Sequence, residues 1–437
     1  MKLLVIYVPK TTNRHKYVFQ IIFKEIYQSN YIITEDFDEY KSANAVKINY
    51  SSNPIIDDEI FVEANGFLSK RDITEIELKI FKKNETKYLF RTDSEKSYLH
   101  DVFSSVFYLI TRYEEYLPHF KDRYGRYLAS ESVASKNNFL QKPIVNIWVK
   151  KFIDFIIEKY PSLEISNPKF NFISTFDIDN AYLYKGKGFV RSIATLLRLF
   201  ISFRFDDIRL AFLVVTNKRK DPFDTYSFQF NLHKKYNIDV RYFVLLGDYG
   251  LNDKNISYTN SNIRTLVKRL SDLAPVGIHP SFGSNKDLNI LQKEISRLED
   301  IQKREVFFSR QHFLQLSLPI TYKNLFSQGI VNDYTMGYSS DLGFRAGIAS
   351  PFTFYDLDLE QILPITIYPF ALTDHILKFN MHLNPSEVIT AVSELINEVK
   401  KVNGTLISVW HNDTFSDFGI WEGWKDVYED IVKFVKK

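Results

Sequence analysis

Residues 171–179 read NFISTFDID, an apolar and β-branched run that ends in two aspartates. Such a run, preceded here by Pro168, is typical of a buried strand. Six later runs share this character and have helical segments between most of them: residues 239–246, 276–279, 306–309, 329–334, 362–368 and 405–410. Seven strands that alternate with helices predict an α/β fold, either a barrel or a doubly wound sheet.

The chain before residue 165 has a different organisation. Short apolar runs at residues 3–8 and 45–48 predict strands, and the apolar spacing over 144–160 predicts a helix that ends at Pro161. We therefore expect a smaller α/β domain over residues 1–164 and a (β/α) unit over residues 165–437. The stretch 181–236 is long for one connection and is expected to be a helical insertion in the second unit.

Composition excludes several classes of function. The 437 residues carry 56 Lys and Arg against 53 Asp and Glu, a formal net charge of +3, which gives no sign of a nucleic-acid groove. Cysteine is absent, so thiol nucleophiles, disulfides and Cys-ligated zinc are excluded. Any metal must be held by histidines and carboxylates.

Two apolar stretches bear on location. The N-terminal run before Pro9 is too short for the apolar region of a signal peptide, so we expect a buried strand there and a cytoplasmic protein. Residues 189–215 are apolar but interrupted by charges, so no transmembrane segment is predicted. Their basic, amphipathic character would suit peripheral contact with an anionic membrane. The interpretation that the sequence favours is a helix packed over the sheet with its arginines in water.

Ionisable residues stand where the predicted strands end. Asp177 and Asp179 follow the run 171–176, and period-two geometry puts both carboxylates on one face. Two carboxylates so close repel each other unless a cation or a proton lies between them, although a turn capped by aspartates is an equal alternative. The other candidates at strand ends are His279, Arg310, His312, Asp333 and His411. In barrels that edge carries the active site.

Each of these signals has an ordinary structural explanation when taken alone. A histidine at the end of an apolar strand, such as His279 or His411, is more often a hydrogen-bonded core residue than a ligand. Arg345 lies in GFRAG, where the glycines permit close approach of a ligand or of another backbone. The shared edge is what favours a functional site.

The motifs TFDID (175–179), HPSFG (279–283), RQHF (310–313) and VWH (409–411) together resemble those of the polysaccharide deacetylases, carbohydrate esterase family four. The resemblance covers about the last 270 residues and implies a distorted seven-stranded (β/α) barrel. With RYEEY (112–116), GRY (125–127), DYTMGY (333–338) and GFRAG (343–347), the pattern is similar to a bacterial branch with an added N-terminal domain, often associated with surface-glycan synthesis.

This resemblance implies a metal-dependent hydrolase that removes N-acetyl, or less often O-acetyl, groups from an acetylated oligo- or polysaccharide, which a lipid-linked glycan would satisfy. It implies zinc held by Asp179 and His279, Asp177 as general base, Arg310 as its partner and His411 as general acid. Asp374, which follows a predicted strand, would lie beside the substrate and keep His411 charged. Arg345, Asp333 and Tyr334 would contact the substrate.

Departures from the family pattern leave alternatives open. Ile178 separates the two aspartates, and Gly283 stands where the family has its second metal histidine. His312, in place of the family's proline, shares a face with Arg310 and would restore a third ligand. Without it, an inactive barrel that binds or scaffolds glycans is expected. A glycosidase that used Asp177 with a second acid would leave His279 and His411 unexplained.

Overall fold

The computed structural model describes residues 3–437 and begins with a four-stranded parallel sheet in the order β2-β1-β3-β4. Its strands are β1 (Leu4–Tyr7), β2 (Tyr31–Thr34), β3 (Val46–Ser51) and β4 (Ile60–Glu63). The strands predicted at 3–8 and 45–48 are thus confirmed as β1 and β3. Associated with this sheet are α1 (Asn13–Phe19), which continues as the π-helical η1 (Gln20–Ile26), α2 (Phe37–Ser42), α3 (Val102–Ile110), α4 (Val133–Lys136), α5 (Ile144–Lys159) and the hairpin β5–β6 (Phe81–Lys83, Thr86–Tyr88).

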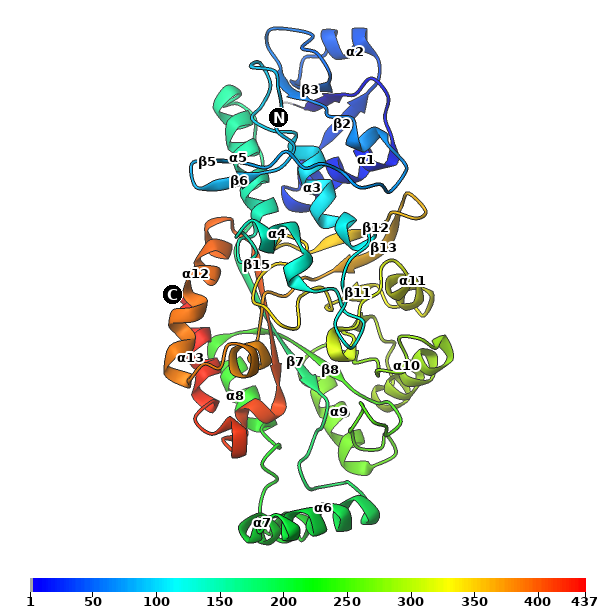
Figure 1. Ribbon diagram of the computed structural model, residues 1–437, viewed down its shortest axis with the longest axis vertical. Coiled ribbons are helices and arrows are strands. Elements are labelled where there is room, and N and C mark those ends of the chain that lie inside the picture. Colours follow the sequence, from blue (N-terminus) through cyan, green and yellow to red (C-terminus); the bar gives the residue numbers. More distant parts are fainter. Residues whose placement is uncertain (1–2) are drawn as a thin grey trace.

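A second sheet of nine strands forms the middle of the molecule, in the order β12-β13-β11-β10-β9-β8-β7-β15-β14 (Figure 1). All seven predicted strands are present: β7 (Asn171–Ile178), β8 (Asp239–Val244), β9 (Val276–Ile278), β10 (Phe308–Ser309), β11 (Asn332–Asp333), β13 (Gln361–Ile367) and β15 (Thr405–His411). Two short strands were not predicted, β12 (Phe352–Asp356) and β14 (Leu372–Thr373). Among the described strands of this sheet, only the β12–β13 pair is antiparallel.

The strand order resembles an opened barrel more than a doubly wound sheet. From β7 to β11 each strand lies beside the next one in sequence; β13 follows β11 with β12 outside it, while β15 and β14 lie on the other side of β7. Within residues 3–437 no pairing joins β12 to β14, so a closed seven-stranded barrel is not observed. The N-terminal region covers the β12 edge instead, since Tyr17 donates to the Thr353 carbonyl and Glu25 accepts from the Thr353 amide.

Helices flank the large sheet and one pair lies apart from it. Flanking helices are α8 (Tyr226–Tyr236), α9 (Ser261–Leu273), α10 (Leu288–Gln302), α11 (Ile320–Ser327), α12 (Val388–Lys401) and α13 (Lys425–Lys436). The helices α6 (Phe189–Ile201) and α7 (Phe205–Val215) form a hairpin at one end of the long axis, opposite the N-terminal sheet (Figure 1). The expectation that the amphipathic helix packs over the sheet is therefore wrong: α6 packs on α7. No helix in the described part of the chain is long and apolar enough to cross a membrane.

One hydrophobic core runs through both sheets. It includes Ile6 and Ile48 of the small sheet, Phe107 of α3, and Phe176 and Ile367 of the large sheet. This continuity fixes the N-terminal region against the large sheet and so positions its loops at the carboxyl ends of the strands.

Candidate active site

The carboxyl ends of β7, β9, β10 and β15 surround a cavity of about 270 Å³. Parallel strands place these ends on one edge, which is why residues far apart in sequence meet there. The cavity is lined by Tyr124, Arg126, Asp177, Asp179, His279, Gln311, His312, Phe313, Leu314, Ser339, Thr373, His375, Val409 and His411. Five of the six residues to which the sequence assigned metal binding or catalysis are therefore on its wall, and the sixth, Arg310, lies deeper.

Three side chains form a compact cluster of ligand atoms. The Nε2 atom of His279 lies 3.2 Å from Asp179 Oδ1, and the Nε2 atom of His312 lies 3.5 Å from Asp179 Oδ2. One ligand atom from each of the three residues lies within 4.8 Å of the others. Two imidazoles and one carboxylate are the protein ligands of one common kind of catalytic zinc site.

The other ring nitrogen of each histidine is already occupied. His279 Nδ1 lies 2.5 Å from the Arg310 carbonyl, and His312 Nδ1 lies 2.8 Å from Asp253 Oδ1. Asp253, on the loop between β8 and α9, also accepts from the Phe282 amide. Bonds of this kind fix the tautomer and aim the Nε2 lone pair at the centre of the cluster.

The cluster is electrostatically incomplete as protein alone. When His279 donates Nδ1–H to the Arg310 carbonyl, its neutral ring presents a lone pair to Asp179 Oδ1, which has no hydrogen-bond partner. Two acceptors 3.2 Å apart require a proton or a cation between them. Burial lowers the pKa of His312, but Asp179 and Asp253 outweigh this and raise it to about 9. Burial would raise the pKa of Asp179, but the two histidines hold it well below its ordinary value.

Asp177 is held separately from this cluster. Arg310 donates from Nη1 to Asp177 Oδ1 at 2.9 Å and to the Thr175 hydroxyl at 2.7 Å, and its Nε donates to the Tyr334 carbonyl. The guanidinium is fully buried and lies over the Phe243 ring. It fixes one oxygen of Asp177 and leaves the other, Oδ2, 3.9 Å from His279 Nε2.

His411 lies across the cavity and is paired with Asp374. Its Nδ1 lies 2.9 Å from Asp374 Oδ1, while its Nε2 is 3.9 Å from Asp179 Oδ2. Burial lowers the pKa of His411, but Asp374 outweighs this and raises it to about 10. The ring of His375 stacks on His411 at 3.8 Å, and burial together with this cationic neighbour lowers its own pKa to about 4.

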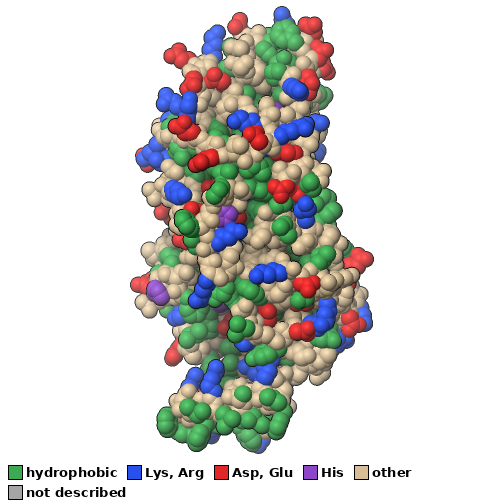
Figure 2. All heavy atoms as spheres, turned by 45° about the vertical axis from the view of Figure 1, so that its right-hand side comes forward, with side chains coloured by type: hydrophobic (Ala, Val, Ile, Leu, Met, Phe, Trp, Pro, Cys, Tyr) green, Lys and Arg blue, Asp and Glu red, His purple; other side chains and the backbone are tan. Residues whose placement is uncertain are grey.

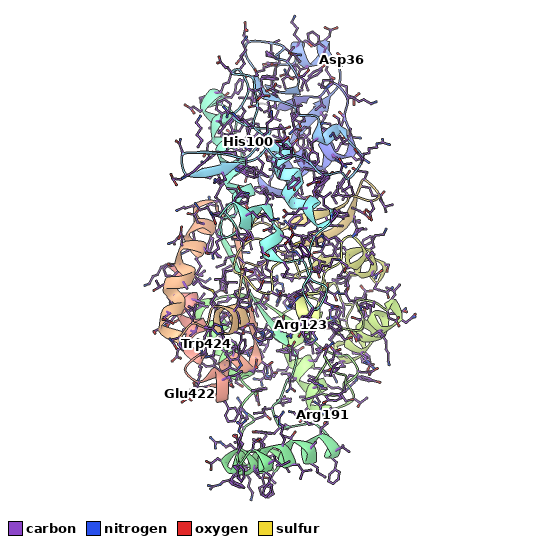
Figure 3. All side chains as sticks on the ribbon, viewed as in Figure 1. Asp36, His100, Arg123, Arg191, Glu422 and Trp424 are labelled. Carbon is purple, nitrogen blue, oxygen red and sulfur yellow. The ribbon has the colours of Figure 1, made fainter. Side chains whose placement is uncertain are left out.

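A loop of the N-terminal region completes the wall. Residues 121–127 reach the cavity beside the turn 312–315; Arg123, labelled in Figure 3, marks this loop at the middle of the molecule. Arg126 Nη1 donates to the Phe313 carbonyl at 2.9 Å, and the Tyr124 ring lies 5.0 Å from that of Phe313. Phe313 and Leu314 have φ values of 59° and 53°, a left-handed conformation that costs free energy and is concentrated at functional sites.

Four residues predicted to lie at the substrate do not line the cavity. Arg345 is buried and makes two hydrogen bonds to Glu115, at 2.8 and 2.6 Å. Asp333 is buried and accepts from the Ser309 and Thr335 hydroxyls. Tyr334 is buried in an apolar cluster and stacks on Tyr368. Asp374 lies behind His411, where it can charge the imidazole but not meet a substrate.

Several residues in or directly behind the cavity wall were missed from the sequence. Asp253 belongs to the irregular loop 245–260, and no motif marks it. His375 directly follows Asp374, so its position in sequence was a usable signal. Tyr124 and Arg126 lie in a region that we assigned to another domain, and only the fold brings them to the strand ends.

Comparisons with known proteins add little to this geometry. A family profile described as "Family of unknown function (DUF7033)" matches residues 4–161. No curated protein matches the sequence.

Solved structures give weak likenesses. A protein described as a polysaccharide deacetylase from Mycobacterium smegmatis aligns at 14% identity and a TM-score of 0.39, over 62% of this chain and 86% of that one. A mutant of a pseudoenzyme of carbohydrate esterase family 4 with restored activity aligns at 11% and 0.28, over 61% and 63%. PuuE allantoinase aligns at 8% and 0.35, over 60% and 83%. At these scores the likeness assigns neither a fold family nor an activity to the chain.

Proposed function

We propose that this protein is a metal-dependent hydrolase that removes acetyl groups from a sugar of a surface glycan. The observation that carries the proposal is the convergence of Asp179, His279 and His312, with both histidine Nδ1 atoms occupied, beside a separately held carboxylate and an imidazolium. The order of the motifs TFDID, HPSFG, RQHF and VWH supports the same chemistry.

The residues present fit a divalent metal, for which zinc is our choice. The unpartnered Asp179 Oδ1 and the two aimed Nε2 atoms are a nitrogen and oxygen donor set without thiolate. Bound there, zinc would polarise an acetyl carbonyl and lower the pKa of a water molecule. His312 would supply the third protein ligand, which Gly283 cannot supply because it has no side chain.

A second group of possible ligands, Asp374, His375 and His411, fits a metal less well. The His411 Nδ1 atom is already bonded to Asp374, whose second oxygen accepts from the His411 amide. His411 and Asp374 therefore already satisfy each other's hydrogen-bonding groups as an ion pair. We therefore assign this group to proton transfer.

Asp177 is proposed as the general base. Its carboxylate must be ionised to accept a proton from an attacking water molecule, and the Arg310 guanidinium, 2.9 Å from Oδ1, fixes its orientation. The free Oδ2 faces the centre of the cavity, on the side where His279 lies.

His411 is proposed as the general acid that protonates the leaving amine or alcohol. Asp374 orients its Nδ1–H and keeps the ring cationic, so that Nε2–H can be donated into the cavity. The proton moves from Nε2 to the leaving atom as the bond to the acetyl carbon breaks.

The wall formed by Tyr124 and Phe313 suits a sugar ring, because aromatic faces pack against the apolar faces of sugars. We propose that residues 1–164 are an accessory unit which completes the substrate cleft and that residues 165–437 carry the chemistry.

The test is the metal content of two single variants. His312→Ala should lose bound zinc and acetate release together, while thermal stability changes little. The matched control is His375→Ala, which removes a cavity histidine outside the Asp179 cluster and should keep its zinc. Loss of zinc in the control alone would place the metal at the other cluster and contradict the proposal. A wild-type protein that binds acetylated oligosaccharides without metal or turnover would instead indicate an inactive glycan-binding protein.

A further inference from the structure

The hairpin of α6 and α7 concentrates exposed apolar side chains: residues 189–215 contain 11 of the 29 exposed large hydrophobic residues in the described chain. Phe189, Val190, Ile201 and Phe203 are 81%, 79%, 74% and 81% exposed. Further exposed apolar residues on the two helices and their turn are Ile193, Leu196, Leu197, Phe200, Phe205, Phe212 and Val215. In Figure 2 these side chains gather at the lower end of the molecule. Soluble surfaces rarely expose a continuous apolar patch of this kind without a partner.

Positive charge is concentrated on the same segment. Residues 185–220 contain nine Lys and Arg and two Asp, a formal net charge of +7, whereas the whole chain carries +3. The rest of the chain is therefore net negative. Apolar residues bordered by Lys and Arg are the composition of helices that lie in the interface of an anionic bilayer.

The hairpin is fixed to the body at its base. The Asp221 carboxylate, after α7, accepts from the amides of Leu183 and Tyr184, before α6. Arg191 donates to the carbonyls of Asn255 and Lys254 and lies 4.1 Å over the Tyr249 ring. Arg191 is labelled in Figure 3 where the hairpin meets the body. These contacts hold the helices crosswise to the long axis (Figure 1), so that both can lie on one plane.

The interior of the hairpin is loosely filled. A cavity of about 190 Å³ lies between its helices and is lined mainly by apolar side chains, among them Leu196, Ile208, Phe212 and Val215. Only Leu199, Ala211 and Val214 of the two helices are buried. Two helices with so little buried between them gain their stability elsewhere, and acyl chains would supply the missing apolar contacts.

We propose that the α6–α7 hairpin docks the protein on the surface of an anionic lipid bilayer. The apolar side chains enter the boundary between headgroups and acyl chains, and the basic residues remain at the headgroups. A second copy of the chain is the competing occupant of such a face. The charge argues against it, because two hairpins of net +7 repel each other on approach.

The experiment measures binding of the whole protein to vesicles, without metal or glycan, so that its result is independent of hydrolase activity. Vesicles of phosphatidylcholine with one third phosphatidylglycerol should co-sediment with the protein at low salt. Pure phosphatidylcholine vesicles should bind it much more weakly. Raised salt should weaken binding to the anionic vesicles, since exposed charges are screened.

Variants locate the surface. The double variant Phe200→Glu, Phe203→Glu should weaken partitioning into the bilayer by at least about 100-fold, because two phenyl rings that would be buried among the lipids are lost. The double variant Arg198→Gln, Arg209→Gln should weaken binding to the anionic vesicles about 30-fold and leave binding to pure phosphatidylcholine vesicles unchanged. The matched control is Phe37→Glu, an exposed phenylalanine of α2 at the opposite end of the molecule, which should bind like wild type.

Two results would overturn the proposal. The first is absence of co-sedimentation at low salt, or equal binding by wild type and the Phe200→Glu, Phe203→Glu protein. The second is a wild-type dimer in sedimentation velocity that this double variant converts to monomer, with no vesicle binding by either. That result would assign the face to self-association.

Discussion

Two buried arginines, Arg310 and Arg345, belong to ionic clusters that look alike in sequence and differ in structure. Arg345 and Arg112 face Glu114 and Glu115, two cations against two anions, and every guanidinium and carboxylate of this junction cluster in the described chain has a partner. In the cavity cluster, Arg310 Nη2 and Asp179 Oδ1 have none. A closed ionic cluster holds a fold together, whereas one with unsatisfied atoms on an open cavity is prepared for a ligand.

The largest expected effect tests the open cluster. Asp177→Asn should lower acetate release by about 10²–10⁴-fold, because the amide cannot accept a proton. Metal content and the melting temperature should remain near those of wild type, since the amide oxygen still accepts from Arg310. A variant with normal turnover would show that Asp177 is not the base.

The same change from carboxylate to amide in the junction cluster should lower the stability of the fold instead of the rate of acetate release. Glu115→Gln leaves two buried guanidiniums undercompensated and should cost about 3 kcal/mol of unfolding free energy at pH 7. Urea denaturation measures it. The matched control is Asp154→Asn in the exposed pair with Lys150, which should cost under about 1 kcal/mol.

The difference in unfolding free energy between wild type and Glu115→Gln should itself depend on pH. Burial raises the pKa of Glu115, but Arg345 and Arg112 outweigh this and lower it to about 2, from an ordinary 4.5. Because the folded-state pKa is depressed, the stabilisation is complete above about pH 5 and is lost as the pH falls from there toward 2. Wild type and Glu115→Gln should therefore converge in stability as the pH falls below 4.5. A gap that stays constant with pH would mean that the charge of Glu115 is not what stabilises the junction.

A smaller effect is expected at Asp253, which orients the proposed metal ligand His312. Asp253→Asn should weaken zinc affinity by about 10–100-fold, because His312 loses the carboxylate that orients it. Competition with a chelator measures the affinity. Unchanged affinity would show that Asp253 acts only on the Phe282 amide.

The smallest effect concerns the wall supplied by the N-terminal loop. Arg126→Gln should lower kcat/KM about fivefold, because the Phe313 carbonyl loses a charged donor and the left-handed turn loosens. Arg123→Gln is the control: Arg123 lies over the Tyr124 ring but does not line the cavity. Equal losses in both variants would indicate a general effect on the loop.

The sequence predicted the strands and the shared edge well, because both follow from local patterns. Alternation worked even past the end of β10: the amides of Arg310 and His312 donate to the carbonyls of Ile278 and Pro280, which continues the ladder at two-residue spacing. His312, our proposed third ligand, was placed in the cluster for this reason.

What failed depended on contacts between distant segments. The glycines around Arg345 suggested approach of a ligand or a backbone, and the structure shows a backbone: a Cβ atom on Gly343 would lie 2.4 Å from the Leu140 carbonyl oxygen. Asp253 and the loop 121–127 carry no periodic signal. The absence of pairing between β12 and β14 also depends on how the two sheets pack, which no single segment encodes.

The wall formed by Tyr124 and Arg126 has a consequence for how such proteins diversify. Under the proposed function, substitutions in this short loop would reshape the entrance for another sugar without altering any proposed ligand or proton-transfer group. The loop and the strand ends are separated by about 50 residues or more of sequence, so recombination can exchange one and keep the other. Selectivity and reactivity can therefore be inherited separately, and related chains with the same strand-end residues would be expected to differ first in this loop.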